Sequence, residues 1–250
     1  MGFLEEIIPK VKESVDSGYY VHLREEKRKS FVESIEEEKE RGVVPIIAEV
    51  KPFSPTQGRL IKKEEMKRYA QEFVRGGACA LSILTEPKIF EGDILLLQEK
   101  WAVPVLMKDF VIDRRQIGSG DCVLLIQRLL DLCRLDADEF ISYAHEDKIE
   151  VLLEVHNVEE FERAKKTEAD IIGINNRDLA TMEVDINTTI KILEKTKSDR
   201  IVVSESGINS PTDVKRLIDA GADAILVGTG LLVGRDIRKK IYELKMAASK

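Results

Sequence analysis

The amino-acid sequence predicts an α/β protein whose eight parallel strands close into a (β/α)8 TIM barrel. Short apolar stretches alternate with helical ones through most of the chain, which is typical of a parallel sheet. The chain has 250 residues, about the length of one such barrel. No Gly-x-Gly-x-x-Gly motif follows the first apolar stretch, which argues against an open, doubly wound sheet.

An N-terminal helical extension precedes the first strand. We expect this extension, residues 1–45, to lie over a barrel formed by residues 46–250, and apolar residues at helical spacing indicate helices over 3–14 and 30–41. Strands are expected to start near Ile46, Ala78, Pro104, Cys122, Val151, Asp170, Ile201 and Asp223. Helices are expected over Glu64–Arg75, Asp136–His145, Val158–Lys166, Asn187–Lys195, Pro211–Ala220 and Asp236–Met246.

The third strand–helix unit is shorter than the others. Only residues 109–121 separate Lys108 from the strand that starts at Cys122, which leaves room for about two turns of helix. The run Gly118-Ser119-Gly120 indicates a turn. We therefore expect a shortened third outer helix, with at most a helical fragment between Asp113 and Asp121.

Composition limits the partners that the chain can have. Charged residues make up 34% and hydrophobic residues 43%, and the net charge is −7 with Lys and Arg spread along the sequence. This balance is typical of a soluble globular protein and argues against nucleic acid as a main partner. No apolar run reaches the length of a membrane span, and the N-terminus does not resemble a signal peptide.

The cysteines and histidines predict neither disulfides nor a metal site. Cys79, Cys122 and Cys133 include no Cys-x-x-Cys pair, which favours reduced thiols and a cytoplasmic location. The three histidines show no metal-ligand spacing.

Charged or amide side chains follow most of the predicted strands at their C-terminal ends. Glu49 and Lys51 end the first strand and, two residues apart, share one face of it. The others are Lys108 after the third strand, Glu154 after the fifth, Asn175 and Arg177 after the sixth, and Glu205 after the seventh. Charged residues without a functional role would occur at both ends of the strands, so we interpret this ring as the catalytic mouth of the barrel. Taken singly, each pair could instead be an ion pair that caps a strand.

Two glycine-containing loops predict a phosphate site. Ser206 and Gly207 follow the seventh strand, and Gly228 and Thr229 follow the eighth. Glycine lets backbone N–H groups approach an anion, and barrels favour these two loops for phosphate. Each glycine alone could be an ordinary turn residue. Together with Ser54 in the loop after the first strand, they predict a small, phosphorylated substrate.

Several stretches, taken together, resemble the indole-3-glycerol phosphate synthase family. They are Ile47-Ala48-Glu49-Val50-Lys51 with Ser54-Pro55, Leu81-Ser82-Ile83-Leu84-Thr85-Glu86, Leu106-Met107-Lys108-Asp109-Phe110, Leu153-Glu154-Val155-His156, Gly173-Ile174-Asn175-Asn176-Arg177-Asp178-Leu179 and Ser204-Glu205-Ser206-Gly207-Ile208. The resemblance implies a barrel lyase of tryptophan biosynthesis that uses no cofactor and no metal. It also implies the substrate 1-(2-carboxyphenylamino)-1-deoxyribulose 5-phosphate, which undergoes ring closure, decarboxylation and dehydration.

The resemblance also implies roles for the residues at the strand ends. We expect Lys108 to be the general acid, with its pKa lowered by burial, and Glu154 to be the base on the far side of a space for the substrate. Lys51 is expected to bind the substrate carboxylate or to act as the second acid, Glu49 to balance the lysines, and Asn175 to bond the substrate. The expected substrate-binding residues are Ser54, Phe110, Arg177, Glu205, Ser206, Gly207, Gly228 and Thr229.

Two rival functions were weighed. Phosphoribosylanthranilate isomerase is also a phosphate-binding barrel, but it would use a Cys and Asp pair that these strand ends do not offer. A non-catalytic or engineered barrel that only binds a phosphorylated ligand would not need the complete set of Lys51, Lys108 and Glu154. His156 is expected to support the site or to lie at the surface.

Overall fold

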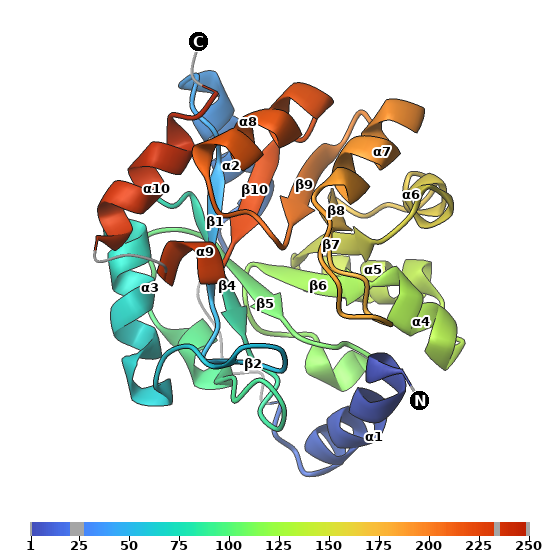
Figure 1. Cartoon of the computed structure of the whole chain (residues 1–250). Helices are drawn as coiled ribbons and strands as arrows, with labels where there is room; N and C mark the ends of the chain where they lie inside the picture. The colour runs from blue at the N-terminus through green and yellow to red at the C-terminus, as the bar shows by residue number, and fades with distance from the viewer. Residues whose placement is uncertain (1, 21–27, 233–235, 249–250) are drawn as a thin grey trace.

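A closed barrel of eight parallel strands forms the centre of the protein, so the predicted fold class is confirmed (Figure 1). The computed structural model describes residues 2–20, 28–232 and 236–248. The barrel strands are β1 (Ile46–Val50), β4 (Ala80–Leu84), β5 (Val105–Lys108), β6 (Cys122–Ile126), β7 (Glu150–Val155), β8 (Ile171–Asn175), β9 (Ile201–Glu205) and β10 (Ala224–Val227). Each pairs with the next along the chain, and β10 pairs with β1. A hairpin of β2 (Phe53–Ser54) and β3 (Gly58–Arg59) follows β1.

Helices surround the barrel, and all the predicted ones are present within a few residues of their expected bounds (Figure 1). The helices that follow the barrel strands are α3 (Met66–Arg75), α4 (Gln127–Cys133), α5 (Ala137–Glu146), α6 (Val158–Ala164), α7 (Asn187–Lys195), α8 (Pro211–Ala220), α9 (Thr229–Leu232) and α10 (Ile237–Lys245). The start of α8 shows the local cause, because the Ser210 side chain accepts a hydrogen bond from the Asp213 amide and Pro211 takes the first helical position.

The sequence did not predict several short elements, namely α4, α9, η2 and the β2–β3 hairpin. Helix α4 follows β6 without a loop, so its apolar residues Leu129 and Leu130 read in the sequence as a continuation of the strand. A 3-10 helix, η2 (Ile94–Gln98), follows β4. A further 3-10 turn, η1 (Lys63–Glu65), leads directly into α3.

The third outer helix is reduced to one 3-10 turn, η3 (Arg114–Gln116), as the glycine-rich turn after it predicts. Gly120 has a φ of +83°, and a Cβ there would lie 3.2 Å from the Val105 carbonyl oxygen of β5. The Arg28 guanidinium donates to the carbonyl oxygens of Gly118 and Gly120. The turn thus packs directly against the barrel where neighbouring units place a helix.

The two helices of the N-terminal extension contact opposite ends of the barrel. Helix α1 (Phe3–Asp16) reaches the C-terminal ends of the strands, where the Phe3 ring lies 6.0 Å from that of Phe110. Helix α2 (Phe31–Glu40) lies at the N-terminal ends, where the Glu150 carboxylate accepts from the Phe31 and Val32 amides. None of the helices in the described part of the chain is long and apolar enough to cross a membrane.

Candidate active site

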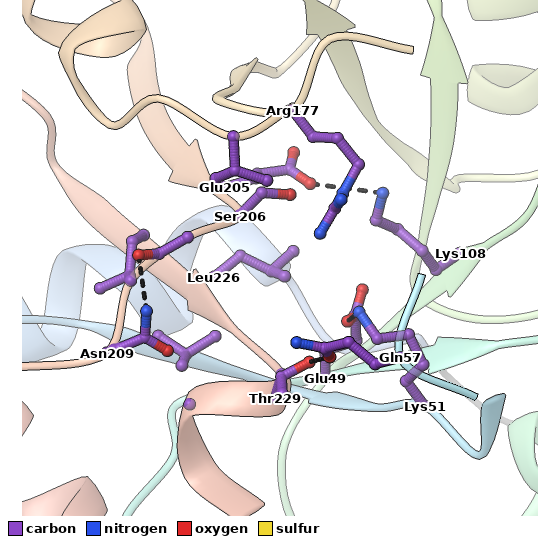
Figure 2. Close-up of a pocket in the computed structure, with 16 residues that line it drawn as sticks. Glu49, Lys51, Gln57, Lys108, Arg177, Glu205, Ser206, Asn209, Leu226 and Thr229 are labelled. Atoms are coloured by element: carbon purple, nitrogen blue, oxygen red, sulfur yellow. Dashed lines mark hydrogen bonds and ion pairs between the residues drawn. The ribbon is translucent and has the colours of Figure 1, made fainter. Parts of the chain in front are cut away.

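Two adjoining cavities lie at the C-terminal ends of the strands, where the sequence predicted the mouth. The first has a volume of about 340 Å³ and is drawn in Figure 2. The second, of about 80 Å³, lies toward α1. Both are lined by Glu49, Lys51, Lys108, Arg177 and Ser206. A charged group of residues therefore stands where the two cavities meet.

Lys108 is the centre of this charged group. It is the last residue of β5, and its ammonium lies 3.1 Å from Glu154 Oε2 and 3.3 Å from Glu205 Oε2. The side chain of Lys108 is 14% exposed and those of Glu154 and Glu205 are 1% and 2% exposed. The expectation of a space for the substrate between Lys108 and Glu154 is wrong for this state of the site, because the two side chains form a direct ion pair.

The electrostatics of Lys108 also differ from the expectation. Burial alone would lower the pKa of Lys108, but the carboxylates of Glu154, Glu205 and Glu49 outweigh burial and raise it above its usual value. The same ammonium, against the opposing effect of burial, holds the pKa of Glu154 well below its usual range. Lys108 is therefore a charged donor at neutral pH, and the predicted lowering of its pKa by burial was wrong.

Glu205 is the weakest anion of the group. Burial, followed by the neighbouring carboxylates of Glu154 and Glu49, raises its pKa to about 7, although Lys108 acts in the opposite direction. Its Oε1 has no hydrogen-bond partner. A Cβ on Gly173 of β8 would collide with this oxygen, so the glycine at that position makes room for the Glu205 carboxylate.

Glu49 and Lys51 form a second ion pair at the end of β1. Their side chains share one face of the strand, as predicted, and Lys51 Nζ lies 2.5 Å from Glu49 Oε2. Burial opposes ionisation of Glu49, yet the charges of Lys51 and Lys108 lower its pKa. Both ends of the pair line both cavities.

A histidine lies directly behind Glu154. His156 Nε2 is 3.3 Å from Glu154 Oε1, on the side away from Lys108, and His156 Nδ1 is 3.2 Å from Glu160 Oε2 of α6. The Glu160 carboxylate also accepts from the His156 amide. His156 therefore supports the site from behind, in agreement with one of the two expectations for it.

Asn175 and Arg177 end β8 and start the loop above the cavities. The Asn175 Oδ1 accepts from the Arg177 amide, and the Arg177 guanidinium donates to the Met182 carbonyl oxygen. A bridge between Arg177 and Val184 closes this loop. In Figure 2 the Arg177 side chain extends into the space near Lys108 and Glu205.

The glycine-containing loops line the first cavity opposite Lys108. Ser206 and Gly207 have φ of +70° and +80°, a region that a serine adopts only where its surroundings enforce it. The Ser206 carbonyl oxygen accepts from Asn176, and the Gly207 carbonyl oxygen accepts from Asn209. These bonds fix the loop so that Gly207 lies at the cavity wall.

The second glycine loop faces the first across the same cavity. Gly228, Thr229 and Gly230 line it, and the Thr229 hydroxyl donates to Gln57 Oε1 over a distance of 3.2 Å (Figure 2). Ser54, which we expected beside them, lines the second cavity instead. Gln57, three residues later in the same loop, takes that place.

One wall of the second cavity is apolar. The rings of Phe90 and Phe110 stack with centroids 5.7 Å apart, and the Phe3 ring meets the Phe90 ring edge-on at 6.2 Å. Leu84, Leu179 and Met182 complete the apolar wall. Of these residues only Phe110 was expected from the sequence to bind the substrate, and it belongs to the stretch Leu106-Met107-Lys108-Asp109-Phe110 that resembles the family.

Comparison with known proteins gives a consistent result. The family model described as indole-3-glycerol phosphate synthase matches residues 5–244. The indole-3-glycerol phosphate synthase of Methanocaldococcus jannaschii is 40% identical over 209 residues, which are 80% of this chain and 77% of the relative. That of Staphylococcus aureus strain Newman is 35% identical over 261 residues, with 98% of each chain covered.

A solved structure shares the fold alone. The N-acetylmannosamine-6-phosphate 2-epimerase from Clostridium perfringens aligns over 83% of this chain and 93% of its own, with a TM-score of 0.55 and 16% identity.

Proposed function

The chain belongs to the indole-3-glycerol phosphate synthase family, and we propose from this premise which residues perform each part of its reaction. The enzyme converts 1-(2-carboxyphenylamino)-1-deoxyribulose 5-phosphate to indole-3-glycerol phosphate by ring closure, decarboxylation and dehydration. The observation that carries our assignment is the position of the Lys108 ammonium, between two carboxylates and at the junction of two cavities, the second of which has an apolar wall.

The two cavities suit the two ends of the substrate. The phosphate is bound in the first cavity by the backbone of Gly207 and Gly228 and by the cation of Arg177, which line the same space. The carboxyphenyl ring lies in the second cavity, against Phe90 and Phe110. This orientation puts the ribulose carbonyl near Lys108, where the cavities meet.

Lys108 is the general acid of the ring closure. A charged ammonium among carboxylates stabilises the oxyanion that develops on the carbonyl, and it donates a proton as the carbon–carbon bond forms. Since neighbouring carboxylates raise its pKa, Lys108 is fully charged when the substrate enters. Lys108 can still give up its proton in the transition state, because the developing alkoxide is a far stronger base than any group of the resting site.

Glu154 is the base that removes the ring proton in the final aromatisation. The substrate displaces the Lys108–Glu154 contact and leaves the two groups on either side of the reacting carbon atoms. Lys51 binds the substrate carboxylate until it leaves as CO2, and Glu49 holds Lys51 in place through the 2.5 Å ion pair. Asn175 bonds the ribulose hydroxyls, and Glu205 keeps Lys108 oriented.

The net charge and the cysteines support a proposal for the partners of the enzyme and for its location. We propose that the small phosphorylated substrate is its main partner and that it does not bind nucleic acid, since the net charge is −7. We place it in the cytoplasm, where the thiols of the buried Cys79 and Cys122 stay reduced.

The assignment is tested by the fluorescence of indole-3-glycerol phosphate formed from the carboxyphenylamino substrate. Lys108→Met keeps the bulk of the side chain and removes its proton, so kcat should fall at least ~100-fold with little change in KM. The matched variant Lys51→Met removes a cation that binds the substrate, so its main effect should be a higher KM. A Lys108→Met enzyme with nearly normal kcat would transfer the acid role to Lys51.

A further inference from the structure

Each turnover of this reaction consumes one proton from outside the substrate. The carbonyl oxygen receives one proton in ring closure, and the same oxygen receives a second one when it leaves as water. Only one proton is removed from the ring, and the carboxylate leaves as CO2 without one. The balance is therefore substrate carboxylate plus H⁺ gives indole product, CO2 and water. A bound substrate fills the mouth, so a proton that reaches Lys108 before the product leaves must come from another side.

The structure offers such a route behind Glu154. Glu154 Oε2 contacts Lys108, while Glu154 Oε1 faces His156 Nε2 at 3.3 Å. Both of these facing atoms are buried, and neither has a partner with hydrogen-bond geometry. A small rotation of the carboxylate would bring them into a hydrogen bond. Glu154 is thus in contact with Lys108 on one oxygen and with His156 on the other.

His156 also lines a third cavity. Its volume is about 250 Å³, and its lining includes His156, Asn176, Asp178, Glu183 and Asp185. It shares no lining residue with the first cavity and only Asn175 with the second. Its polar lining suits ordered water. His156 therefore contacts Glu154 and also lines a polar space that the substrate does not occupy.

We propose that His156 is a positioning residue which, through Glu154, passes to Lys108 the proton that each turnover consumes. This inference rests on the proposed roles of Lys108 and Glu154. In the step, the His156 Nε2–H bond breaks as an O–H bond forms on Glu154 Oε1. The carboxyl group then turns about its Cγ–Cδ bond and gives the proton to the neutral amine of Lys108. The neutral imidazole keeps its Nδ1–H and turns so that Nε2 takes a proton from water in the third cavity, and the ring then turns back to face Glu154.

The charges around His156 favour this direction of transfer. Burial alone would lower the pKa of His156, but Glu154 of β7 and Glu160 of α6 raise it to about 9. Asp178 of the loop after β8 adds a further negative charge, while Arg128 of α4 neutralises part of Glu160 and Asp178. The imidazolium is thus populated at neutral pH, and its proton moves toward Lys108, whose pKa is higher.

The test compares two variants of His156 by kcat, KM and pH profile. His156→Ala should lower kcat about 10- to 100-fold with little change in KM, and added imidazole, entering through the third cavity, should restore most of the loss. His156→Gln keeps an N–H donor toward Glu154 but cannot pass on a proton, so its kcat should stay low with or without imidazole. The wild-type kcat should fall above about pH 9, and this fall should vanish in His156→Gln.

The matched control is His145→Ala. His145 also pairs with a carboxylate, Asp170 at 2.9 Å, but it lies far from the mouth, so kcat should be unchanged and insensitive to imidazole. The proposal is overturned if His156→Gln has wild-type kcat and pH profile, or if imidazole fails to restore folded His156→Ala. If Glu154→Gln also keeps full activity, the failure belongs to the proposed function and not to the role of His156.

Discussion

The two ends of the barrel carry the same kinds of residue but use them differently. We call the strand-end residues Glu49, Lys51, Lys108, Glu154 and Glu205 the C-terminal rim, and Asp121, Glu150, Asp170 and Asp223 the N-terminal rim. In the C-terminal rim the carboxylates contact ammonium groups or other side chains. In the N-terminal rim they accept backbone amides: Asp121 from Val105, Glu150 from Phe31 and Val32, Asp170 from Val151, and Asp223 from Val202.

A carboxylate at a strand end is therefore not by itself a sign of catalysis. From the sequence we expected charged residues without a catalytic role at both ends of the strands and catalytic ones at the C-terminal ends alone. Acidic residues in fact occur at both ends. What separates the rims is the backbone amide: each N-terminal carboxylate accepts a hydrogen bond from one, although Asp170 and Asp223 also contact His145 and Lys39. A backbone amide bound to a carboxylate fixes the start of a strand, whereas two buried side chains of opposite charge can exchange a proton or a ligand.

The largest expected effect is on kcat at the C-terminal rim. Glu154→Gln removes the base but keeps the size of the side chain, so kcat should fall at least ~100-fold, with KM within a few-fold of the wild type. Its counterpart Glu150→Gln, on the same strand β7 but at the N-terminal rim, should leave kcat unchanged. Steady-state kinetics with the fluorescent product compares them, and equal losses in both variants would abolish the distinction between the rims.

The second prediction concerns stability at the N-terminal rim. Asp170→Ala leaves the Val151 amide and His145 without their partner, so the free energy of unfolding should fall by about 1–3 kcal/mol. The kcat of the folded enzyme should stay at the wild-type value. Urea unfolding followed by circular dichroism measures the first quantity. A variant of normal stability, or a stable variant with low kcat, would contradict the structural role of Asp170.

The sequence predicted local features of the fold but not the contacts between residues that are distant in the chain. Local patterns determine strands and turns, so the eight strands and the short third unit were predicted. Contacts between distant residues were not: Glu154 and Lys108 are 46 positions apart and in direct contact, and Phe3 lies against Phe90 although 87 residues separate them. The predicted direction of the Lys108 pKa shift was wrong because an apolar sequence pattern indicates burial but does not show that three carboxylates meet at Lys108.

The third prediction tests the phosphate side of the first cavity. Gly207 has a φ of +80°, and a Cβ there would collide with Val184. Gly207→Ala should therefore shift the loop and raise KM about tenfold, the value of one lost hydrogen bond to a charged group, with a smaller change in kcat. Gly228 is a poorer probe, since a Cβ there would collide with Glu49 and disturb the ion pair as well.

The matched control for Gly207 is Gly221→Ala. Gly221 has a φ of +113° at the end of α8, and a Cβ there would meet nothing closer than Lys197 Nζ at 3.6 Å. Both substitutions strain a left-handed backbone, at a cost of about 1 kcal/mol, but Gly221 is not part of either cavity lining. An increase in KM for Gly221→Ala as large as that for Gly207→Ala would attribute the effect to strain and not to phosphate binding.

The last prediction is a pH dependence of stability that originates at Glu205 of the C-terminal rim and at Asp109, which follows β5. Burial raises the pKa of Glu205 to about 7, and burial likewise raises the pKa of Asp109 to about 7. The folded protein therefore keeps protons on these groups up to about pH 7, while the unfolded chain releases them near pH 4. Because the folded state binds more protons between these values, the free energy of unfolding should fall as pH rises from about 4.5 to 7, by at most about 1.4 kcal/mol per pH unit for each group.

Glu205→Gln should flatten this slope and make the protein more stable than the wild type above pH 7, even though the Lys108 site is impaired. Urea unfolding at several pH values measures the slope. A slope that Glu205→Gln leaves unchanged would mean that Glu205 is ionised throughout the window and that the buried carboxylate of the C-terminal rim costs no stability.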